Sequence, residues 1–349
     1  MSQAKPIRRK LDLKNGRVDL SHGAGGRAMG QLIEDIFHAA FDNDWLRAGN
    51  DQSAFDVSAG RMVMTTDAYV VSPIFFPGGD IGSLAVNGTI NDIAMAGARP
   101  LYLSASFVIE EGFPLADLAR VAASMGGAAR AAGTPIITGD TKVVERGKAD
   151  KVFVSTTGVG VAPPGLNLSS DAARPGDVAI VSGTMGDHGV AVMSKRENLE
   201  FETEILSDTA ALHGLVADMV KAAGPGLRVM RDPTRGGLAA TLNELAHQSG
   251  VGFSIEEAAI PIRPEVAAAC EFLGLDPLNV ANEGKLVAIV APEFADALLA
   301  AMKAHPLGAD SAVIGRTVDD PNRFVEMRTA FGGGRIVDWL SGEQLPRIC

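Results

Sequence analysis

Apolar positions along this chain follow two periods, one typical of helices and one typical of strands, and the two periods alternate. After the glycine-rich stretch 21–26, Met29, Leu32, Ile36 and Phe37 recur at helical spacing. Further helices are expected over 84–98, 115–132, 208–223 and 237–250. Strands are expected over 61–67, 101–109, 134–138, 151–161, 177–182 and 227–231, with one more inside 280–292. The pattern therefore predicts a mixed α and β protein of the α+β class.

The length of the chain, 349 residues, favours two domains, because single hydrophobic cores rarely grow beyond about 250–300 residues. Pro163, Pro164 and Gly165 interrupt both periods and mark the predicted boundary. We expect four segments: a flexible head over 1–20, an N-terminal domain over 21–163, a C-terminal domain over 164–340 and an extended, mobile tail over 341–349.

Charge and cysteine content narrow the classes of function. The net charge is −11, which argues against broad nucleic-acid binding and against attachment to an anionic membrane. The head over 1–20 is basic, but no apolar stretch follows it as in a secretory signal. No apolar run approaches the length that a membrane-spanning helix needs. The two cysteines, Cys270 and Cys349, supply neither a disulfide framework nor a cysteine-rich metal site. A reducing cytoplasm is the expected compartment.

Aspartates stand at the ends of predicted strands and helices, each beside small residues. These are Asp51, Asp67, Asp92, Asp140 and Asp232. Short carboxylates in such places can converge on Mg²⁺, which takes oxygen ligands together with substrate phosphates. Each of them alone has an ordinary interpretation as a helix cap or turn residue. Five in similar contexts favour a shared metal and phosphate site.

The glycine-rich stretch 23–28 matches the dinucleotide pattern G-x-G-x-x-A, but no βαβ unit frames it, so we reject a Rossmann interpretation. Its backbone N–H groups, at the start of a helix, remain candidates for phosphate binding. A Walker A loop is absent, so any nucleotide must be held by another fold. Lys142 follows a predicted strand in the expected loop 139–142 and is either a phosphate ligand or an exposed loop lysine.

The last residue, Cys349, is the most unusual feature of the sequence. An exposed terminal thiol is prone to oxidation, which favours a use for it. Residues 341–349 span about 30 Å when extended, enough to reach from the surface into a cleft. An incidental cysteine is the alternative. By contrast, Cys270 lies in an apolar predicted helix and is expected to be inert core.

Several motifs together resemble the HypE family of hydrogenase maturation factors, in the aminoimidazole ribonucleotide synthetase superfamily. They are DAYVVSPIFFPGGDIGSLAVNGTINDIAMAGARP at 67–100, GDTKVV at 139–144, DPTRGGLAATLNE at 232–244, NEGK at 282–285 and PRIC at 346–349. The aspartate motifs are shared across the superfamily, whereas the terminal PRIC is specific. The resemblance implies a two-domain PurM-like fold, with the N-terminal sheets of a homodimer pairing into a β-barrel and ATP bound nearby.

The resemblance also implies site residues. Magnesium would be held by Asp51, Asp67, Asp92 and Asp232. Nucleotide contacts would come from His22, Gly23, Gly25, Gly26, Asp51, Asp67, Asn91, Asp92, Asp140, Thr141, Asp232 and Thr234. Cys349 would carry the reacting group, Glu283 would act as the base and Lys142 would serve the phosphate.

The implied reaction converts an S-carbamoyl group on Cys349 into an S-cyano group with ATP, which supplies cyanide ligands for the iron of NiFe hydrogenase. A carbamoyltransferase, HypF, would be the donor, and a HypC–HypD scaffold would be the acceptor. Two alternatives stay open. One is a nucleotide-gated carrier without chemistry of its own. The other is a related ATP-dependent enzyme such as selenophosphate synthetase, which typically uses a cysteine or selenocysteine near the N-terminal loop, where residues 1–40 have none.

Overall fold

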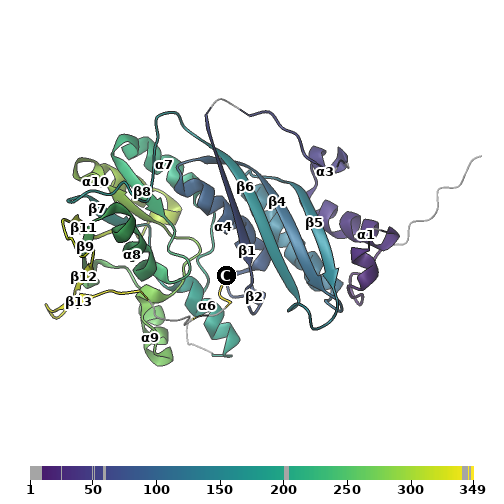
Figure 1. The fold of residues 1–349 in the computed structure, drawn as a ribbon. Coiled ribbons are helices and arrows are strands. Elements are labelled where there is room, and N and C mark those ends of the chain that lie inside the picture. Colours follow the sequence, from purple (N-terminus) through teal and green to yellow (C-terminus); the bar gives the residue numbers. More distant parts are fainter. Residues whose placement is uncertain are drawn as a thin grey trace, which may run out of the picture.

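The computed structural model describes residues 10–24, 26–48, 50, 52–57, 60–199, 204–339, 345 and 347–349. Two bodies, each built on its own sheet, lie side by side with helix α4 (Ile81–Met95) between them (Figure 1). Helix α4 packs against α7 (His213–Ala223) and β8 (Leu227–Arg231) of the second body. The groups carried by α4 can therefore face the second body.

The first body is a four-stranded sheet in the order β1-β6-β4-β5. Its strands are β1 (Arg61–Tyr69), β6 (Val152–Ala162), β4 (Arg99–Glu110) and β5 (Ile136–Val144). Only the β4–β5 pair is parallel. Burial alternates strictly along β6, because α4 and α5 (Leu115–Ala131) cover one face and leave the other open. The sheet does not close into a barrel within this chain, so β1 and β5 are its edges.

Short elements frame the first sheet. On the β5 side lie the short helices η1 (Leu20–Gly23), α1 (Arg27–Leu32), η2 (Ile33–His38), α2 (Ala39–Phe41) and α3 (Asp44–Ala48). A two-stranded ribbon forms between β2 (Phe75–Phe76) and β3 (Gly79–Asp80). The helix expected after residues 21–26 is confirmed, although it is broken into three pieces with a π-helical middle.

The second body is a seven-stranded sheet in the order β13-β12-β9-β11-β7-β10-β8. The strands are β7 (Val178–Val181), β9 (Gly252–Glu256), β10 (Val287–Val290), β11 (Ala312–Val318), β12 (Val325–Arg328) and β13 (Gly334–Ile336), beside β8. Its longer helices are α6 (Asp187–Arg196), α7, α8 (Gly237–Ser249), α9 (Pro264–Leu273) and α10 (Ala295–Ala304). The central strands β7 and β10 are buried along their whole length, which is the mark of a sheet covered on both faces.

The structure corrects two predicted elements. Residues 139–142 are not a loop, because β5 continues from Ile136 to Val144. The helix expected from residue 208 begins at His213, because Asp208 and Leu212 hydrogen-bond to Glu283 and Asn91 in other parts of the chain. Mixed α and β architecture is confirmed, while the proposed domain limits stay a prediction. Within the described ranges, no helix has the length and apolar content that crossing a bilayer requires.

Candidate active site

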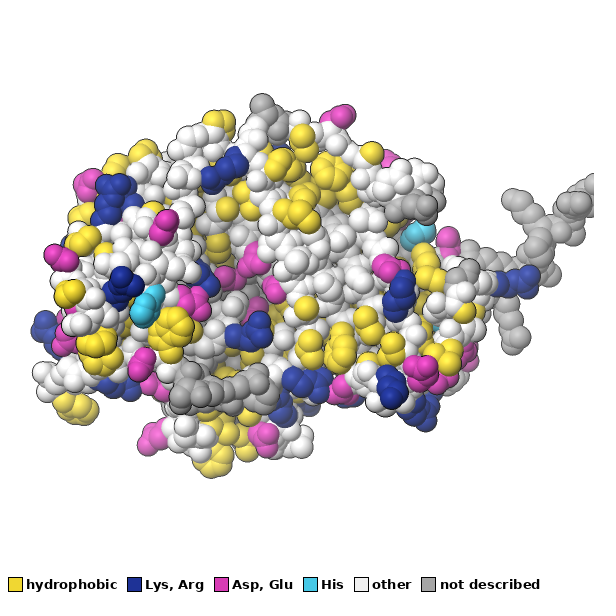
Figure 2. All heavy atoms as spheres, viewed as in Figure 1, with side chains coloured by type: hydrophobic (Ala, Val, Ile, Leu, Met, Phe, Trp, Pro, Cys, Tyr) yellow, Lys and Arg dark blue, Asp and Glu magenta, His cyan; other side chains and the backbone are white. Residues whose placement is uncertain are grey.

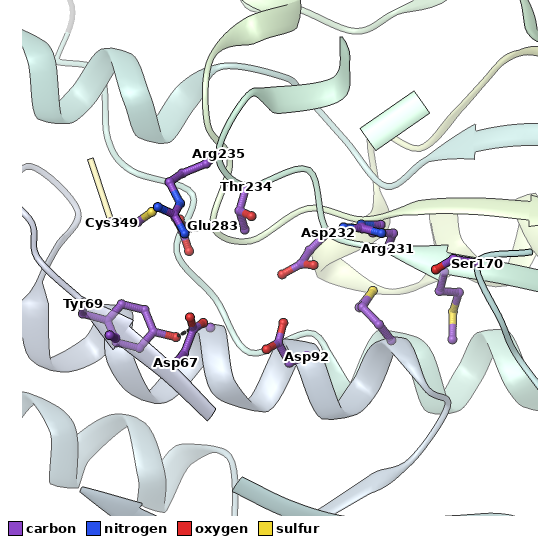
Figure 3. Close-up of a pocket in the computed structure, with 14 residues that line it drawn as sticks. Asp67, Tyr69, Asp92, Ser170, Arg231, Asp232, Thr234, Arg235, Glu283 and Cys349 are labelled. Carbon is purple, nitrogen blue, oxygen red and sulfur yellow. Dashed lines mark hydrogen bonds between the residues drawn. The ribbon is translucent and has the colours of Figure 1, made fainter. Parts of the chain in front are cut away.

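A pocket of about 340 Å³ lies between the two bodies, within the size range of small-molecule sites. Figure 2 shows the hollow, where acidic side chains gather. Both bodies and the end of the chain contribute to its wall. The lining residues used below are Asp67, Tyr69, Gly88, Asp92, Arg231, Asp232, Thr234, Arg235, Glu283 and Cys349 (Figure 3). Residues far apart in the sequence thus converge on one space.

Three aspartates face this space from three elements: Asp67 from β1, Asp92 from α4 and Asp232 from the end of β8. The Asp92 carboxylate accepts a hydrogen bond from the Thr65 hydroxyl at 2.7 Å. Burial, with the negative charge of Asp67 added, still raises the pKa of Asp92. Burial and the charge of Asp92 raise the pKa of Asp232 to about 7. The pocket therefore concentrates negative charge that a bound cation would offset.

Glu283 sits in a turn that hydrogen bonds fix from several sides. Its N–H donates to the Asp208 carboxylate at 2.9 Å, and its carbonyl oxygen accepts from the Asn91 side chain at 3.1 Å. The preceding Asn282 donates its side-chain amide to the carbonyl oxygen of Pro233. Gly284 is required because a Cβ there would collide with the carbonyl oxygen of Asp208. The turn thus has one conformation, with the carboxylate of Glu283 aimed into the pocket (Figure 3).

The Glu283 side chain is itself buried, and one of its oxygens has no hydrogen-bond partner within the described residues. Burial raises the pKa of Glu283 well above its usual value, and the charges of Asp232, Asp208 and Asp67 raise it further. Because burial and neighbouring carboxylates disfavour its charged form, this carboxyl group binds a proton more readily than an exposed glutamate does.

Cys349 reaches the pocket from the C-terminus, and its thiol lies within hydrogen-bonding reach of the Glu283 carboxylate. Residues 347–349 are docked against the body of the protein, while the mobility expected of the tail stays a prediction. Ile348 is buried, and a main-chain oxygen of Cys349 accepts from the N–H of Val70 at 3.2 Å. Burial, followed by the charge of Glu283, raises the pKa of the Cys349 thiol. The docked thiol is therefore held in its neutral form.

Tyr69 and Arg235 are among the lining residues that were missed from the sequence. Tyr69 donates its hydroxyl to Asp67 at 3.0 Å and packs over Gly88 of α4, where any Cβ would collide with that hydroxyl. Arg235 lies beside Cys349 and Glu283, and its positive charge acts on the thiol (Figure 3). Arg235 belongs to the DPTRGG motif, so its position next to Asp232 and Thr234 was a signal that could have identified it.

Three predicted residues on β5 lie outside this pocket. Lys142 is exposed and pairs with Asp140 at 2.6 Å, whereas Thr141 between them is buried on the opposite face. Successive side chains of a strand alternate between faces, so Asp140 and Lys142 share the open face of the sheet. Asp67 instead lies on the same face of β1 as Thr65, whose hydroxyl contacts α4. Within the described residues of one chain, Lys142 therefore lies apart from the carboxylates that line the pocket.

In the glycine-rich segment and at Asn91, the described residues among the predicted nucleotide contacts take part in helix caps, packing and main-chain hydrogen bonds. The ring nitrogen Nδ1 of His22 accepts from the N–H of Asp19, closing the cap of η1, and Gly23 lies against Val143 of β5. Gly26 forms the N-cap of α1. Asn91 is buried and uses both of its amide N–H groups on main-chain oxygens. Gly25 and Asp51, also predicted to bind nucleotide or metal, lie outside the described residues.

In the part of the chain that the structure describes, no three His, Cys, Asp or Glu side chains converge closely enough to hold a metal ion alone. Magnesium commonly binds through one or two carboxylates plus substrate phosphates and water, so a complete protein cage is not required. Burial is the main cause of the raised pKa values of Asp92 and Asp232, and the positive charge of Arg231 offsets it only in part. These carboxylates therefore fit a magnesium ion that phosphate oxygens share.

Comparisons with known proteins agree with this architecture. The family model for the N-terminal domain of AIR synthase related proteins matches residues 49–162, and that for the C-terminal domain matches residues 174–328. A carbamoyl dehydratase HypE from Rhizobium leguminosarum bv. viciae is 79% identical over 345 residues, which is 99% of each chain.

Solved structures of HypE proteins are also similar to this chain. A hydrogenase maturation protein HypE in complex with ATP is 50% identical with a TM-score of 0.91, and the match covers 95% of this chain and 99% of that one. The HypE chain of a HypE–HypF complex is 48% identical with a TM-score of 0.78, over 88% of this chain and 99% of that one. The chain belongs to the HypE family of carbamoyl dehydratases, within the AIR synthase related proteins.

Proposed function

We propose that this chain uses ATP to dehydrate an S-carbamoyl group on its own Cys349, giving an S-cyano group. The observation that carries the proposal is the position of the thiol. Cys349 lies in the same pocket as Glu283 and the aspartates Asp67, Asp92 and Asp232. A carbamoyl group on this sulfur would thus lie between a proton acceptor and a group of carboxylates suited to a metal-bound phosphate.

The chemistry balances in two steps. In the first, the carbamoyl oxygen bonds to the γ-phosphorus of ATP, the bond from that phosphorus to ADP breaks, and one N–H proton is lost. In the second, the carbon–oxygen bond breaks, phosphate leaves with the electron pair, and the remaining N–H proton is lost. Phosphorylation is needed because oxide or hydroxide is a poor leaving group. The products are ADP, phosphate and the S-cyano chain.

The residues of the pocket have distinct roles in this proposal. Glu283 accepts the N–H protons, for which its buried position and raised pKa are suited. Asp67, Asp92 and Asp232 would hold Mg²⁺, with Asp51 as a further predicted ligand, and the bound ion would supply neutralisation of phosphate charge. Thr234 and Arg235 also line the pocket, and we propose that they contact the phosphoryl group as it moves from ATP to the carbamoyl oxygen. Positioning and charge neutralisation dominate such transfers.

The proposed reaction requires one partner that donates the carbamoyl group to the sulfur of Cys349 and another that accepts the cyano group from it. The solved complex of HypE with HypF supports HypF as the carbamoyl donor for this chain. A HypC–HypD scaffold is proposed as the acceptor of the cyano group, for the iron of NiFe hydrogenase. Because the docked thiol is half-buried and lies against Glu283, we propose that residues 347–349 leave the pocket for both exchanges.

The proposed homodimer pairs the N-terminal sheets into a β-barrel. Both edges, β1 and β5, offer strand N–H and C=O groups for pairing, and Met62 and Met64 are exposed on the open face of β1. Pairing β1 of one copy with β5 of another brings Lys142 to the strand that carries Asp67. We propose that Lys142 serves phosphate from the partner across the paired edge, although within one chain Lys142 and Asp67 lie on opposite faces of the sheet.

The test is ATP turnover by chains loaded with carbamoyl groups. Wild-type protein, supplied with carbamoyl donor and HypF, should release one phosphate for each loaded chain. Cys349→Ala should lose this carbamoyl-dependent phosphate release while it still binds ATP in equilibrium dialysis. Full cyanide formation by Cys349→Ala would refute the proposal. Loading of the wild type without phosphate release would favour the carrier alternative.

A further inference from the structure

Helix α6 contacts both reacting parts of the proposed site. At its start, the N–H of Gly186 donates to the Asn282 side chain at 2.7 Å, and the N–H of Gly189 donates to the carbonyl oxygen of Ala281 at 3.0 Å. Residues 281 and 282 immediately precede Glu283. The first turn of α6 is therefore bonded to the turn that carries the proposed base.

The same helix binds the C-terminal tail. The ring nitrogen Nε2 of His188 lies 2.9 Å from the carbonyl oxygen of Ile348, and Nη2 of Arg196 donates to the carbonyl oxygen of Arg347 at 2.8 Å. The Nε group of Arg196 also donates to the carbonyl oxygen of Ser72 at 2.8 Å. Because Ser72 donates its own N–H to Arg347 at 3.1 Å, Arg196 joins the tail to the segment beside it.

The environment of His188 fixes its role as a donor. The ring is buried, and Phe76 packs edge-on against it at 5.4 Å between ring centroids. A carbonyl oxygen can only accept, so Nε2 carries the proton, and Nδ1 accepts from the Ser207 hydroxyl at 2.8 Å. Burial lowers the pKa of His188, which favours this neutral form. Ser207 is followed by Asp208, the residue that binds the N–H of Glu283.

We propose that His188 and Arg196 are positioning residues: through them α6 binds the tail at Ile348 and Arg347 and holds the sulfur of Cys349 against Glu283. Other contacts of the tail are main-chain bonds from the N–H groups of Val70 and Ser72 and an ion pair between Arg347 and Asp150. Changes to the side chains of α6 leave these contacts intact. His188 and Arg196 thus set the fraction of chains in which the tail is docked. The effect of docking on cyano formation rests on the proposed function, whereas the docking of the tail itself does not.

The first test measures the docked fraction without ATP or a carbamoyl group. The probe is iodoacetamide, and the readout is the alkylation rate of Cys349, resolved by peptide mass from the buried Cys270. His188→Phe removes the donor but keeps a ring, so labelling should rise about 2- to 10-fold, as for a neutral hydrogen bond. Arg196→Met keeps the aliphatic stem, and labelling should rise roughly 10- to 100-fold, as for a charged one.

Matched variants separate positioning from general damage. Lys195→Met removes one positive charge from the adjacent exposed position on α6 and should label at the wild-type rate. His188→Gln and Arg196→Lys each retain a donor and should restore part of the protection. If His188→Phe does not fold, Arg196→Met with its Lys195→Met control still decides the question. Wild-type labelling rates in both folded variants, His188→Phe and Arg196→Met, would overturn the inference.

The second test splits loading from dehydration. In single-turnover mass spectrometry, Arg196→Met should accept carbamoyl groups from HypF at least as fast as wild type. Its conversion of carbamoyl to cyano should slow in proportion to the loss of docked chains, which the labelling rate gives when it is compared with that of the denatured chain. A large loss of docked chains with unchanged conversion would also overturn the inference, since docking would not then govern chemistry. A wild type that loads but never forms the cyano group would refute the proposed function and leave the labelling result intact.

Discussion

At the scale of single residues, the account depends most on the carboxyl group of Glu283. Its pKa is raised by burial and by neighbouring carboxylates, and among the described tail residues it contacts the thiol of Cys349, the proposed attachment point. The sequence identified Glu283 through the NEGK motif, but a turn carboxylate in a sequence does not reveal its burial. That burial arises from Asp208 and Asn91, which lie far away in the chain.

Replacing the base tests this role. Glu283→Gln keeps the size of the side chain and the main-chain bonds of the turn but cannot accept a proton. We expect normal carbamoyl loading and a fall of roughly 10²- to 10⁴-fold in the rate of cyano formation. Single-turnover mass spectrometry of the tail peptide measures both steps. Normal cyano formation by this variant would assign the base to another residue.

Gly284 gives a prediction about stability. In Gly284→Ala the new Cβ meets the carbonyl oxygen of Asp208, so we expect a loss of about 1–3 kcal/mol in the free energy of unfolding. Gly127→Ala is the control, because Gly127 lies inside α5 with open space around its Cβ position and should be neutral or stabilised. Urea denaturation compares the two. Equal stability of both variants would contradict the tight packing of this turn.

At the scale of elements, the apolar pattern predicted some strands and helices but not others. Long apolar runs predicted β4, β6 and β8 well, because each of these strands is buried on at least one face. The strand expected over 61–67 is also present as β1, although most of its covered face is only half-buried. Residues 139–142 look like a loop in sequence, since Gly139 and Asp140 are poor strand formers. Pairing with β4 overrides that preference and extends β5 to Val144. Helix α6 was missed because its glycine-rich start resembles a turn.

The edge strands carry a prediction about assembly. If Lys142 acts across paired sheets, Lys142→Met and Cys349→Ser should each be inactive as pure dimers. Mixed dimers should regain about one active site in each heterodimer, since one pocket then has both an intact thiol and an intact partner lysine. Phosphate release from co-expressed, doubly tagged protein measures this. If the mixed dimers are inactive, then either Lys142 acts on the thiol of its own chain or it takes no part in the reaction.

At the scale of the whole molecule, the site exists because two bodies and a chain terminus meet. Periodicity and prolines indicate the bodies, but no local pattern predicts that Ile348 is buried or that Cys349 lies beside Glu283. These contacts span most of the length of the chain, so packing rather than local preference determines them. The motif residues Asp67, Asp92, Asp232, Thr234 and Glu283 were recognisable in sequence, whereas their convergence was not.

The most direct measurement is the intact mass of the chain, followed through one turnover with carbamoyl donor, HypF and ATP. The account predicts the gain of one carbamoyl group on Cys349, followed by the loss of one water from the same residue as ADP and phosphate appear. A carbamoyl group that stays on Cys349 while cyanide forms, or a cyano group that forms on any other residue, would contradict it.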